Sequence, residues 1–328
     1  MQYNIYTDNL KTAVFDIETA GLSFQKDIII SASFCDEDGS NLRQYFCDDP
    51  DSEYLLITKI YEEFDSLDAL ITYNGQRFDV PYVLNRAKKH GISNVYPFIW
   101  NIDIYRILKK YWQAGQLLPS LSQSSVEDAL GIKANRTDTI DGGECIPLYN
   151  MYLAKHDEEA KRKILLHNGD DVRQLARISQ SLSFIPFHKV AYETGYPVKV
   201  LSPDVNSNDI TVYIGPVSEY SDQFSVNAKT FPGLLPMSIF EEYYSLEYDS
   251  FTGAAKLILF PKQLEDYLYL DLTQLPVDID LFKGLDGFAS NYLIIKQNND
   301  ILYKELNKIV SELLKKIVYF NISNHSVT

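Results

Sequence analysis

The stretch TAVFDIETAGL, residues 12–22, constrains the fold of this chain more than any other. It begins like a buried strand, yet Asp16 and Glu18 place two acids two residues apart on one face of that strand. Like charges near a core repel each other and lose hydration unless a cation lies between them. The pair therefore indicates a site for a hard divalent cation such as Mg²⁺ or Mn²⁺. The alternative is a strand end that emerges into water, with Glu18 capping the next turn.

The rest of the composition narrows the class of protein. A chain of 328 residues with 45% hydrophobic content can bury one large core or two ordinary ones. No apolar run approaches the roughly 20 residues that span a bilayer, and the first ten residues lack a basic stretch followed by an apolar one. We therefore expect a cytoplasmic protein without a membrane partner. The cysteines Cys35, Cys47 and Cys145 form no CxxC pair, so neither a disulfide framework nor a zinc site is predicted.

The net charge argues against general, charge-driven binding of nucleic acid. The formal charge is -15, whereas phosphate binding normally shows as a basic face. All eight arginines nevertheless lie in the first 190 residues, the last being Arg177. Arginine is the side chain best suited to forked phosphate contacts, so an anion is expected to bind in this part of the chain.

The order of local signals predicts a two-part α/β protein. Strands are expected at 14–18, 27–35, 42–47 and 69–73, and helices at 54–64, 80–91, 101–112, 124–132, 142–154 and 158–182. This order indicates a mixed sheet flanked by helices, which we assign to a domain of residues 1–190.

Residues 191–328 are predicted to form a smaller, β-rich α+β domain or extension of unknown role. Its expected strands are 196–201, 209–215, 224–231, a hairpin at 245–260, 267–272 and 291–297. A helix should close the chain at 301–320, with Asp300 as its N-cap.

Two further stretches add acids to the first pair. Asp79 follows the strand and turn of ALITYNGQRF at the start of a helix, where it is either an N-cap or a member of the crevice beside the first strand. In that loop, Arg77 meets either a phosphate or only solvent. Farther along, His167 and Asp171 are four apart and share one face of the helix ILLHNGDDVRQLARI. Taken alone, His167 is more simply a structural histidine with satisfied hydrogen bonds.

Taken together, FDIET, YNGQRFDVPYV and HNGDDV resemble, in this order, the three motifs of the DEDD superfamily of 3′–5′ exonucleases, which have a ribonuclease H-like fold. Among these, the chain is most similar to bacterial YprB-type ribonuclease H-like domain proteins, over residues 12 to about 182. The resemblance implies two Mg²⁺ or Mn²⁺ ions. Asp16, Glu18 and Asp171 would hold the first, Asp16 and Asp79 the second, and His167 would be the general base. The spacing of the histidine differs from the usual pattern. His167 lies four residues before Asp171, whereas superfamily members with a histidine usually place it five residues before the aspartate.

The resulting prediction is a metal-dependent nuclease, a 3′–5′ exonuclease on single-stranded DNA or RNA. We expect Thr19, Asn74, Gly75 and Arg77 to contact that substrate. Two alternatives stay open: a catalytically idle nucleic-acid-binding or scaffolding protein that keeps the fold, and a ribonuclease H-like endonuclease. The sequence leaves room for a protein partner of the C-terminal domain but identifies none.

Overall fold

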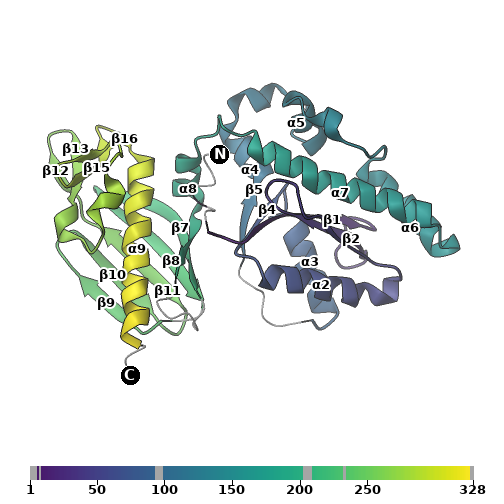
Figure 1. The fold of residues 1–328 in the computed structure, drawn as a ribbon, viewed down its shortest axis with the longest axis horizontal. Helices are drawn as coiled ribbons and strands as arrows, with labels where there is room; N and C mark the ends of the chain where they lie inside the picture. Colours follow the sequence, from purple (N-terminus) through teal and green to yellow (C-terminus); the bar gives the residue numbers. More distant parts are fainter. Residues whose placement is uncertain (1–5, 7–8, 93–98, 202–208, 232–233, 326–328) are drawn as a thin grey trace. The chain divides into compact units, whose positions relative to one another are not determined.

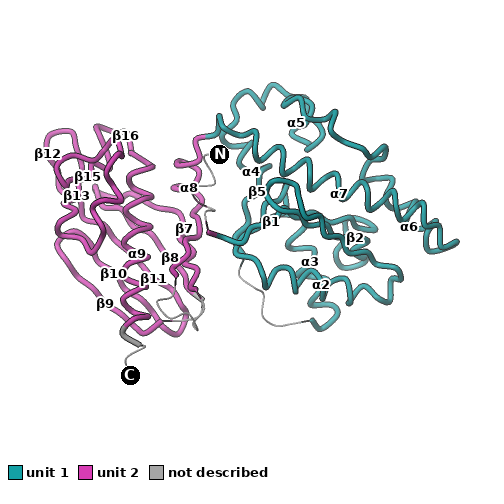
Figure 2. Tube along the Cα trace, in the orientation of Figure 1, with its two compact units in different colours: residues 1, 10–185 teal, residues 2–9, 186–328 magenta. Residues whose placement is uncertain are grey.

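Two compact units make up the chain in this computed structural model, which describes residues 6, 9–92, 99–201, 209–231 and 234–325. Figure 2 shows the first unit as residues 1 and 10–185, and the second as residues 2–9 and 186–328. Tyr6 belongs to the second unit because its hydroxyl contacts His188 Nδ1 at 2.6 Å and accepts a hydrogen bond from Asn307 Nδ2 at 2.9 Å. Every helix among the described residues is too short or too polar to cross a membrane.

A five-stranded sheet in the order β3-β2-β1-β4-β5 lies at the centre of the first unit. The central strand β1 pairs antiparallel with β2 and parallel with β4 (Figure 1). The predicted mixed sheet is therefore confirmed. Its strands are β1 (Thr12–Thr19), β2 (Ile29–Cys35), β3 (Arg43–Phe46), β4 (Ala69–Thr72) and β5 (Trp100–Asp103).

Helices flank this sheet, as the sequence predicted, with one boundary wrong. The segment 101–112 was expected to be a helix or a turn-helix unit with no strand, but Trp100–Asp103 pairs with β4 as a parallel strand. The helix begins only at Ile104, where the Asp103 side chain accepts from Arg106 N. The α-helices of the unit are α2 (Glu53–Asp65), α3 (Asp79–Lys89), α4 (Ile104–Tyr111), α5 (Gln123–Ala129), α6 (Gly142–Lys155) and α7 (Glu158–Gln180).

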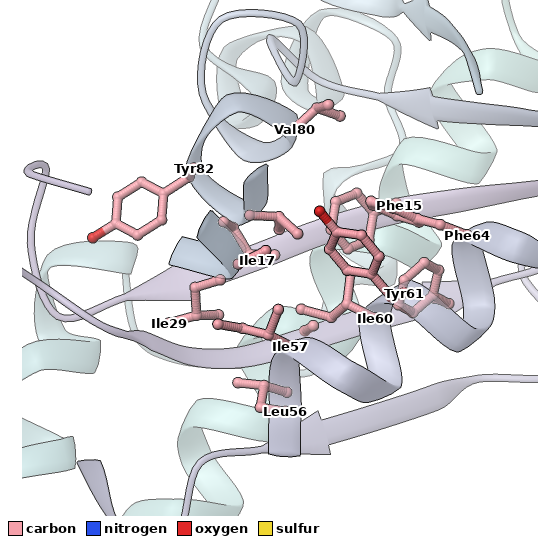
Figure 3. Packing of buried hydrophobic residues seen from close by; sticks show 14 of the residues in the cluster. Phe15, Ile17, Ile29, Leu56, Ile57, Ile60, Tyr61, Phe64, Val80 and Tyr82 are labelled. Carbon is pink, nitrogen blue, oxygen red and sulfur yellow. The ribbon is translucent and has the colours of Figure 1, made fainter. Parts of the chain in front are cut away.

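The two faces of β1 have different neighbours. Phe15 and Ile17 lie in a hydrophobic core with residues of α2 and α3 (Figure 3). In this core the Phe15 ring stacks on Phe34 at 4.6 Å and meets Phe64 edge-on at 5.1 Å. Alternation along the strand sends Asp16 and Glu18 to the opposite face, where α7 packs.

A buried ion pair fastens α2 and α3 to the sheet. Glu53 accepts from Ile29 N at 2.9 Å and from Arg86 Nε at 2.8 Å, and its second oxygen is paired with the other end of the guanidinium. Both side chains are at most 2% exposed. Removing one partner of such a pair leaves the other charged, buried and uncompensated.

The second unit is β-rich, as predicted for the C-terminal region. A six-stranded sheet has the order β6-β7-β8-β11-β10-β9, and a smaller sheet has the order β12-β13-β15-β14 with β16 beside β15. Their strands are β6 (Tyr196–Val200), β7 (Ile210–Tyr220), β8 (Gln223–Phe231), β9 (Met237–Phe240), β10 (Tyr244–Asp249), β11 (Ala254–Leu259), β12 (Lys262–Leu264), β13 (Tyr267–Asp271), β14 (Phe288–Ala289), β15 (Tyr292–Gln297) and β16 (Asp300–Ile301).

The α-helices α8 (Phe187–Thr194) and α9 (Tyr303–His325) also belong to this unit. The predicted N-cap role of Asp300 is wrong, because Asp300 pairs with Gln297 in β16 and α9 begins three residues later. The closing helix itself is confirmed, and its residues Leu306, Ile309 and Leu313 are fully buried.

Replacement of Arg86 by alanine should lower the free energy of unfolding of the first unit by about 3–5 kcal/mol, because the buried Glu53 carboxylate would lose its guanidinium partner and keep only Ile29 N and the His90 ring, 2.7 Å away. Denaturant unfolding of the full chain measures this change. Arg162→Ala is the matched control, because its pair with Glu159 is solvent-exposed and should matter little. Equal stability of the two variants would show that the buried pair is not an anchor.

Candidate active site

The acids of β1 lie where the strand runs past its parallel neighbour. Pairing between β1 and β4 covers Thr12 to Val14, so Asp16 and Glu18 lie beyond the end of that ladder. On the other side, β2 continues, and Asp16 and Glu18 face Ser33 and Ser31 across the antiparallel pair. This half of β1 is therefore held from one side while its other edge is open to the loop that follows β4.

Asp79 fills that open edge. The residue is the first of α3 and is 3% exposed, and its Oδ1 accepts from Ile17 N at 3.2 Å. The N-cap of α3 is Phe78, so Asp79 is the first helical residue and not the cap. Because Ile17 lies between the two acids of β1, this bond places the Asp79 carboxylate beside them. A role as a mere helix cap, one of the two sequence interpretations, does not describe it.

Helix α7 supplies the remaining acid. Asp16, Glu18 and Asp171 each offer a carboxylate oxygen, and these oxygens lie within 4.8 Å of one another. Three convergent carboxylates are a suitable ligand set for a hard divalent cation, which needs oxygen ligands and compensating negative charge. Asp79 lies next to this group, close enough to raise the pKa of Asp16, and is not one of its three members.

The pKa of each of these four carboxyl groups is raised above its ordinary value. Burial is the largest cause for all four, and it raises the pKa of Glu18 to about 8 and that of Asp79 to about 7. The pKa of Asp16 lies well above its ordinary value, because the charges of Asp79, Asp171 and Glu18 add to burial. The pKa of Asp171 is also raised by burial, although His167 and Arg136 favour its ionised form. A bound cation would relieve this repulsion.

His167 lies between two of the acids. Its Nε2 is 3.4 Å from Asp171 Oδ2 and 3.6 Å from Glu18 Oε1, which confirms that His167 and Asp171 share a helix face. Its Nδ1 is hydrogen-bonded to Asp138. Although burial opposes it, the pKa of His167 is raised, because Asp171, Asp138 and Glu18 stabilise the imidazolium.

The loop that carries Asp138 is fixed to α7 by the residue next to the site. Asp170 is 3% exposed and accepts from Thr137 N, Thr137 Oγ1 and Asp138 N. Asp170 is therefore committed to holding this loop, which leaves Asp171 as the acid that faces the site. In the same loop, Arg136 is paired with Asp171 and makes a two-pronged contact with Glu127 at 2.7 and 2.8 Å.

Asn168 orients Asp16. Its Nδ2 donates to Asp16 Oδ2 at 2.8 Å, while its Oδ1 accepts from Ser31 Oγ at 3.0 Å and Ser33 Oγ at 2.7 Å. The two hydroxyls fix which end of the amide faces Asp16. Helix α7 packs closely on the sheet at Gly169, because a Cβ atom there would lie only 3.1 Å from Gln44 Nε2.

The four residues predicted to contact substrate lie in two places, Thr19 at the end of β1 and the other three in the loop between β4 and α3. Thr19 ends β1 and donates to Gly21 O at 2.8 Å. Asn74 has a left-handed backbone (φ 64°), Gly75 is packed so closely on Thr72 that a Cβ atom would lie 2.4 Å away, and Arg77 is exposed. Asp103 shapes this loop by accepting from Asn74 N and Gln76 N. Whether these residues touch a substrate stays a prediction.

Sequence reasoning did not identify Asn168, Asp138, Arg136 or Asp103. Asn168 carried a usable signal, because it lies between His167 and Asp171 and is polar in a segment that packs on a sheet. Asp138 and Arg136 lie in a stretch without periodic pattern, and their role depends on contacts across 29 and 35 residues.

Comparison with known proteins shows that residues 13–183 match a family described as the RNase_H superfamily. The chain is also 38% identical over 98 residues to a DNA polymerase of Pyrococcus glycovorans, a match that covers 26% of this chain and 12% of the polymerase. A DNA polymerase of Methanocaldococcus jannaschii is 36% identical over 100 residues, with coverage of 27% and 6%. The chain thus spans only a small part of these relatives.

Among solved structures, the chain is similar to the family B DNA polymerase of Pyrobaculum calidifontis, with a TM-score of 0.44 and 18% identity over 53% of this chain and 25% of that one. A structure of exonuclease I matches with a TM-score of 0.36 and 11% identity, over 96% of this chain and 70% of that one.

Stability of the metal-free protein should fall as pH rises from about 5 to 8. Acids whose pKa is raised by folding bind protons more tightly in the folded state, so the folded state is disfavoured as pH passes from about 4 toward the raised pKa values of 7 to 8. The raised pKa of His167 acts in the same direction, because the stabilisation of its imidazolium is lost with rising pH. Thermal unfolding after chelation should show a midpoint several degrees lower at the higher pH.

A variant separates this effect from general pH sensitivity. Glu18→Gln removes one of the crowded charges and should raise the unfolding midpoint of the metal-free protein at about pH 8 but not at about pH 5. Glu158→Gln, at an exposed position of α7, is the control. Equal behaviour of both variants would contradict the account of mutual repulsion.

Proposed function

The chain belongs to the RNase H superfamily, and we propose that it is a metal-dependent nuclease that hydrolyses phosphodiester bonds. One observation carries the proposal: the oxygens of Asp16, Glu18 and Asp171 converge within 4.8 Å. A site of this kind costs stability, because burial and repulsion raise the pKa of each acid. A function that needs divalent cations explains why the cost is tolerated.

We assign the ligands as two sets that share one residue. Asp16, Glu18 and Asp171 would hold one Mg²⁺ or Mn²⁺ ion, and Asp16 with Asp79 would hold a second. Bound ions would lower the pKa of the attacking water and stabilise the negative charge on the leaving 3′ oxygen. Asn168 keeps Asp16 in orientation through its 2.8 Å hydrogen bond.

His167 is proposed as the general base. Asp138 holds Nδ1, so Nε2 is the nitrogen that faces Glu18 and Asp171 and would accept the proton of the attacking water. The raised pKa of His167 makes the imidazole a stronger base and keeps more of it protonated at low pH. Activity should therefore rise with pH as the imidazolium loses its proton.

The substrate is proposed to be single-stranded DNA or RNA, degraded from its 3′ end. Support comes from the ordered motifs around Asp16, Asp79 and Asp171, which resemble those of DEDD exonucleases and of YprB-type proteins in particular. The DNA polymerases that share identity with this chain favour DNA. We propose that Thr19, Asn74, Gly75 and Arg77 contact the nucleic-acid strand.

Replacement of Asp16 by asparagine should abolish cleavage, because Asp16 belongs to both proposed ligand sets. With 3′-labelled or 5′-labelled oligonucleotides of DNA and RNA and with Mn²⁺ or Mg²⁺, we expect the loss to exceed about 100-fold, which is more than the loss of a group that only orients a ligand. Asp128→Asn, at an exposed position of α5, should cleave like the parent chain.

Four outcomes are decisive. Stepwise shortening from the 3′ end supports the exonuclease, and internal cuts would replace it with an endonuclease. Cleavage that persists in Asp16→Asn would contradict the site. Binding of oligonucleotides without cleavage of any substrate by the parent chain would favour a binding or scaffolding protein instead.

A further inference from the structure

A second set of metal-binding atoms lies beside the carboxylates. Glu18, Cys145 and His167 are all buried, and a carboxylate oxygen, the Sγ atom and a ring nitrogen lie within 4.8 Å of one another. No local pattern in the sequence predicts this, because Cys145 has no neighbouring cysteine or histidine along the chain. This set differs from the carboxylates in its chemistry, since thiolate and imidazole favour zinc and similar transition metals over Mg²⁺.

Spacing within the set suits one tetrahedral ion. Ligand bonds of about 2.0–2.2 Å at tetrahedral angles put nitrogen and oxygen ligands about 3.4 Å apart. Between His167 Nε2 and Glu18 Oε1 the distance is 3.6 Å. Cys145 Sγ lies within 4.8 Å of both ligand atoms, and the Cys145 thiol is hydrogen-bonded to Glu18.

Surrounding residues already orient the ligands. Asp138 is hydrogen-bonded to His167 Nδ1, the arrangement by which a carboxylate commonly orients a metal-binding histidine. Cys145 is in the first turns of α6, whose start is fixed by a capping box between Asp141 and Glu144. Ahead of it, Gly142 leaves room, because a Cβ atom there would lie 3.8 Å from His167 Nε2 and 4.0 Å from Glu18 Oε2. A water molecule could take the fourth ligand position in that space.

We propose that Glu18, Cys145 and His167 form a site for a zinc-like transition-metal ion that excludes the catalytic arrangement. An ion bound there would occupy Glu18, which is a ligand of the proposed magnesium site. It would also occupy the lone pair with which His167 is proposed to act as general base. Binding displaces the thiol proton of Cys145 to solvent. Metal binding at this site stands on the geometry alone, whereas inhibition by the ion rests on the proposed nuclease function.

Optical titration with Co²⁺, a spectroscopic substitute for Zn²⁺, tests the site without reference to activity. The full chain should bind one Co²⁺ with a thiolate-to-cobalt charge-transfer band in the near ultraviolet, and Zn²⁺ should displace it. Cys145→Ser should lose the band and bind Zn²⁺ at least about 100-fold more weakly. Cys47→Ser, which removes an equally buried thiol outside the set, should keep both.

Two results would overturn the proposal, one measured on the parent chain and one on the variant. Absence of the charge-transfer band in the parent chain would exclude a cysteine ligand, and an unchanged band in Cys145→Ser would assign it to another thiol. Because serine could disturb packing, Cys145→Ala and the unfolding midpoints of both variants serve as checks on folding.

Inhibition is measured separately in the presence of Mg²⁺. Zinc should inhibit cleavage by the parent chain and by Cys47→Ser, and Cys145→Ser should keep its activity at zinc concentrations that stop the parent. Equal inhibition of all three would refute the regulatory role. If no cleavage occurs in any of them, the nuclease proposal fails, while the cobalt band still decides the metal site.

Discussion

Repulsion among four acids, two of them buried and two half-buried, is the constraint on which the arrangement of the first unit depends. Asp16, Glu18, Asp79 and Asp171 come from a strand and two helices, and burial raises the pKa of each. Bringing these carboxylates together lowers the stability of the fold, so other interactions must hold them in place. The fold supplies these interactions through the end of the β1–β4 ladder, the first turn of α3 and the packing of α7 on the sheet.

Each acid has a neutral or cationic neighbour that fixes its direction. Asn168 donates to Asp16, Ile17 N donates to Asp79, and Arg136 is paired with Asp171. His167 lies beside Glu18 and is itself held by Asp138. The oxygens are thus oriented in advance, so that little reorganisation is needed when charge is brought to the site. The same features place a thiol and an imidazole next to one of the acids, which gives the site a second ligand chemistry.

Prediction from sequence succeeded where the signal was local. Alternation in β1 correctly put Asp16 and Glu18 on one face, and a spacing of four put His167 and Asp171 on one face of α7. It failed where a contact between distant segments decided the outcome. Strand β5 exists because it pairs with β4, and Asp300 is in a strand because it pairs with Gln297. The partners of the site, Asn168 and Asp138, act across 152 and 29 residues, a distance that no periodic pattern encodes.

A crystal structure of the protein with Mn²⁺, mapped by the anomalous scattering of manganese, tests the central claim most directly. We expect an anomalous peak within coordination distance of Asp16, Glu18 and Asp171, with a second peak between Asp16 and Asp79. Full occupancy of Mn²⁺ elsewhere on the protein, with no peak at these carboxylates, would contradict the proposed metal site.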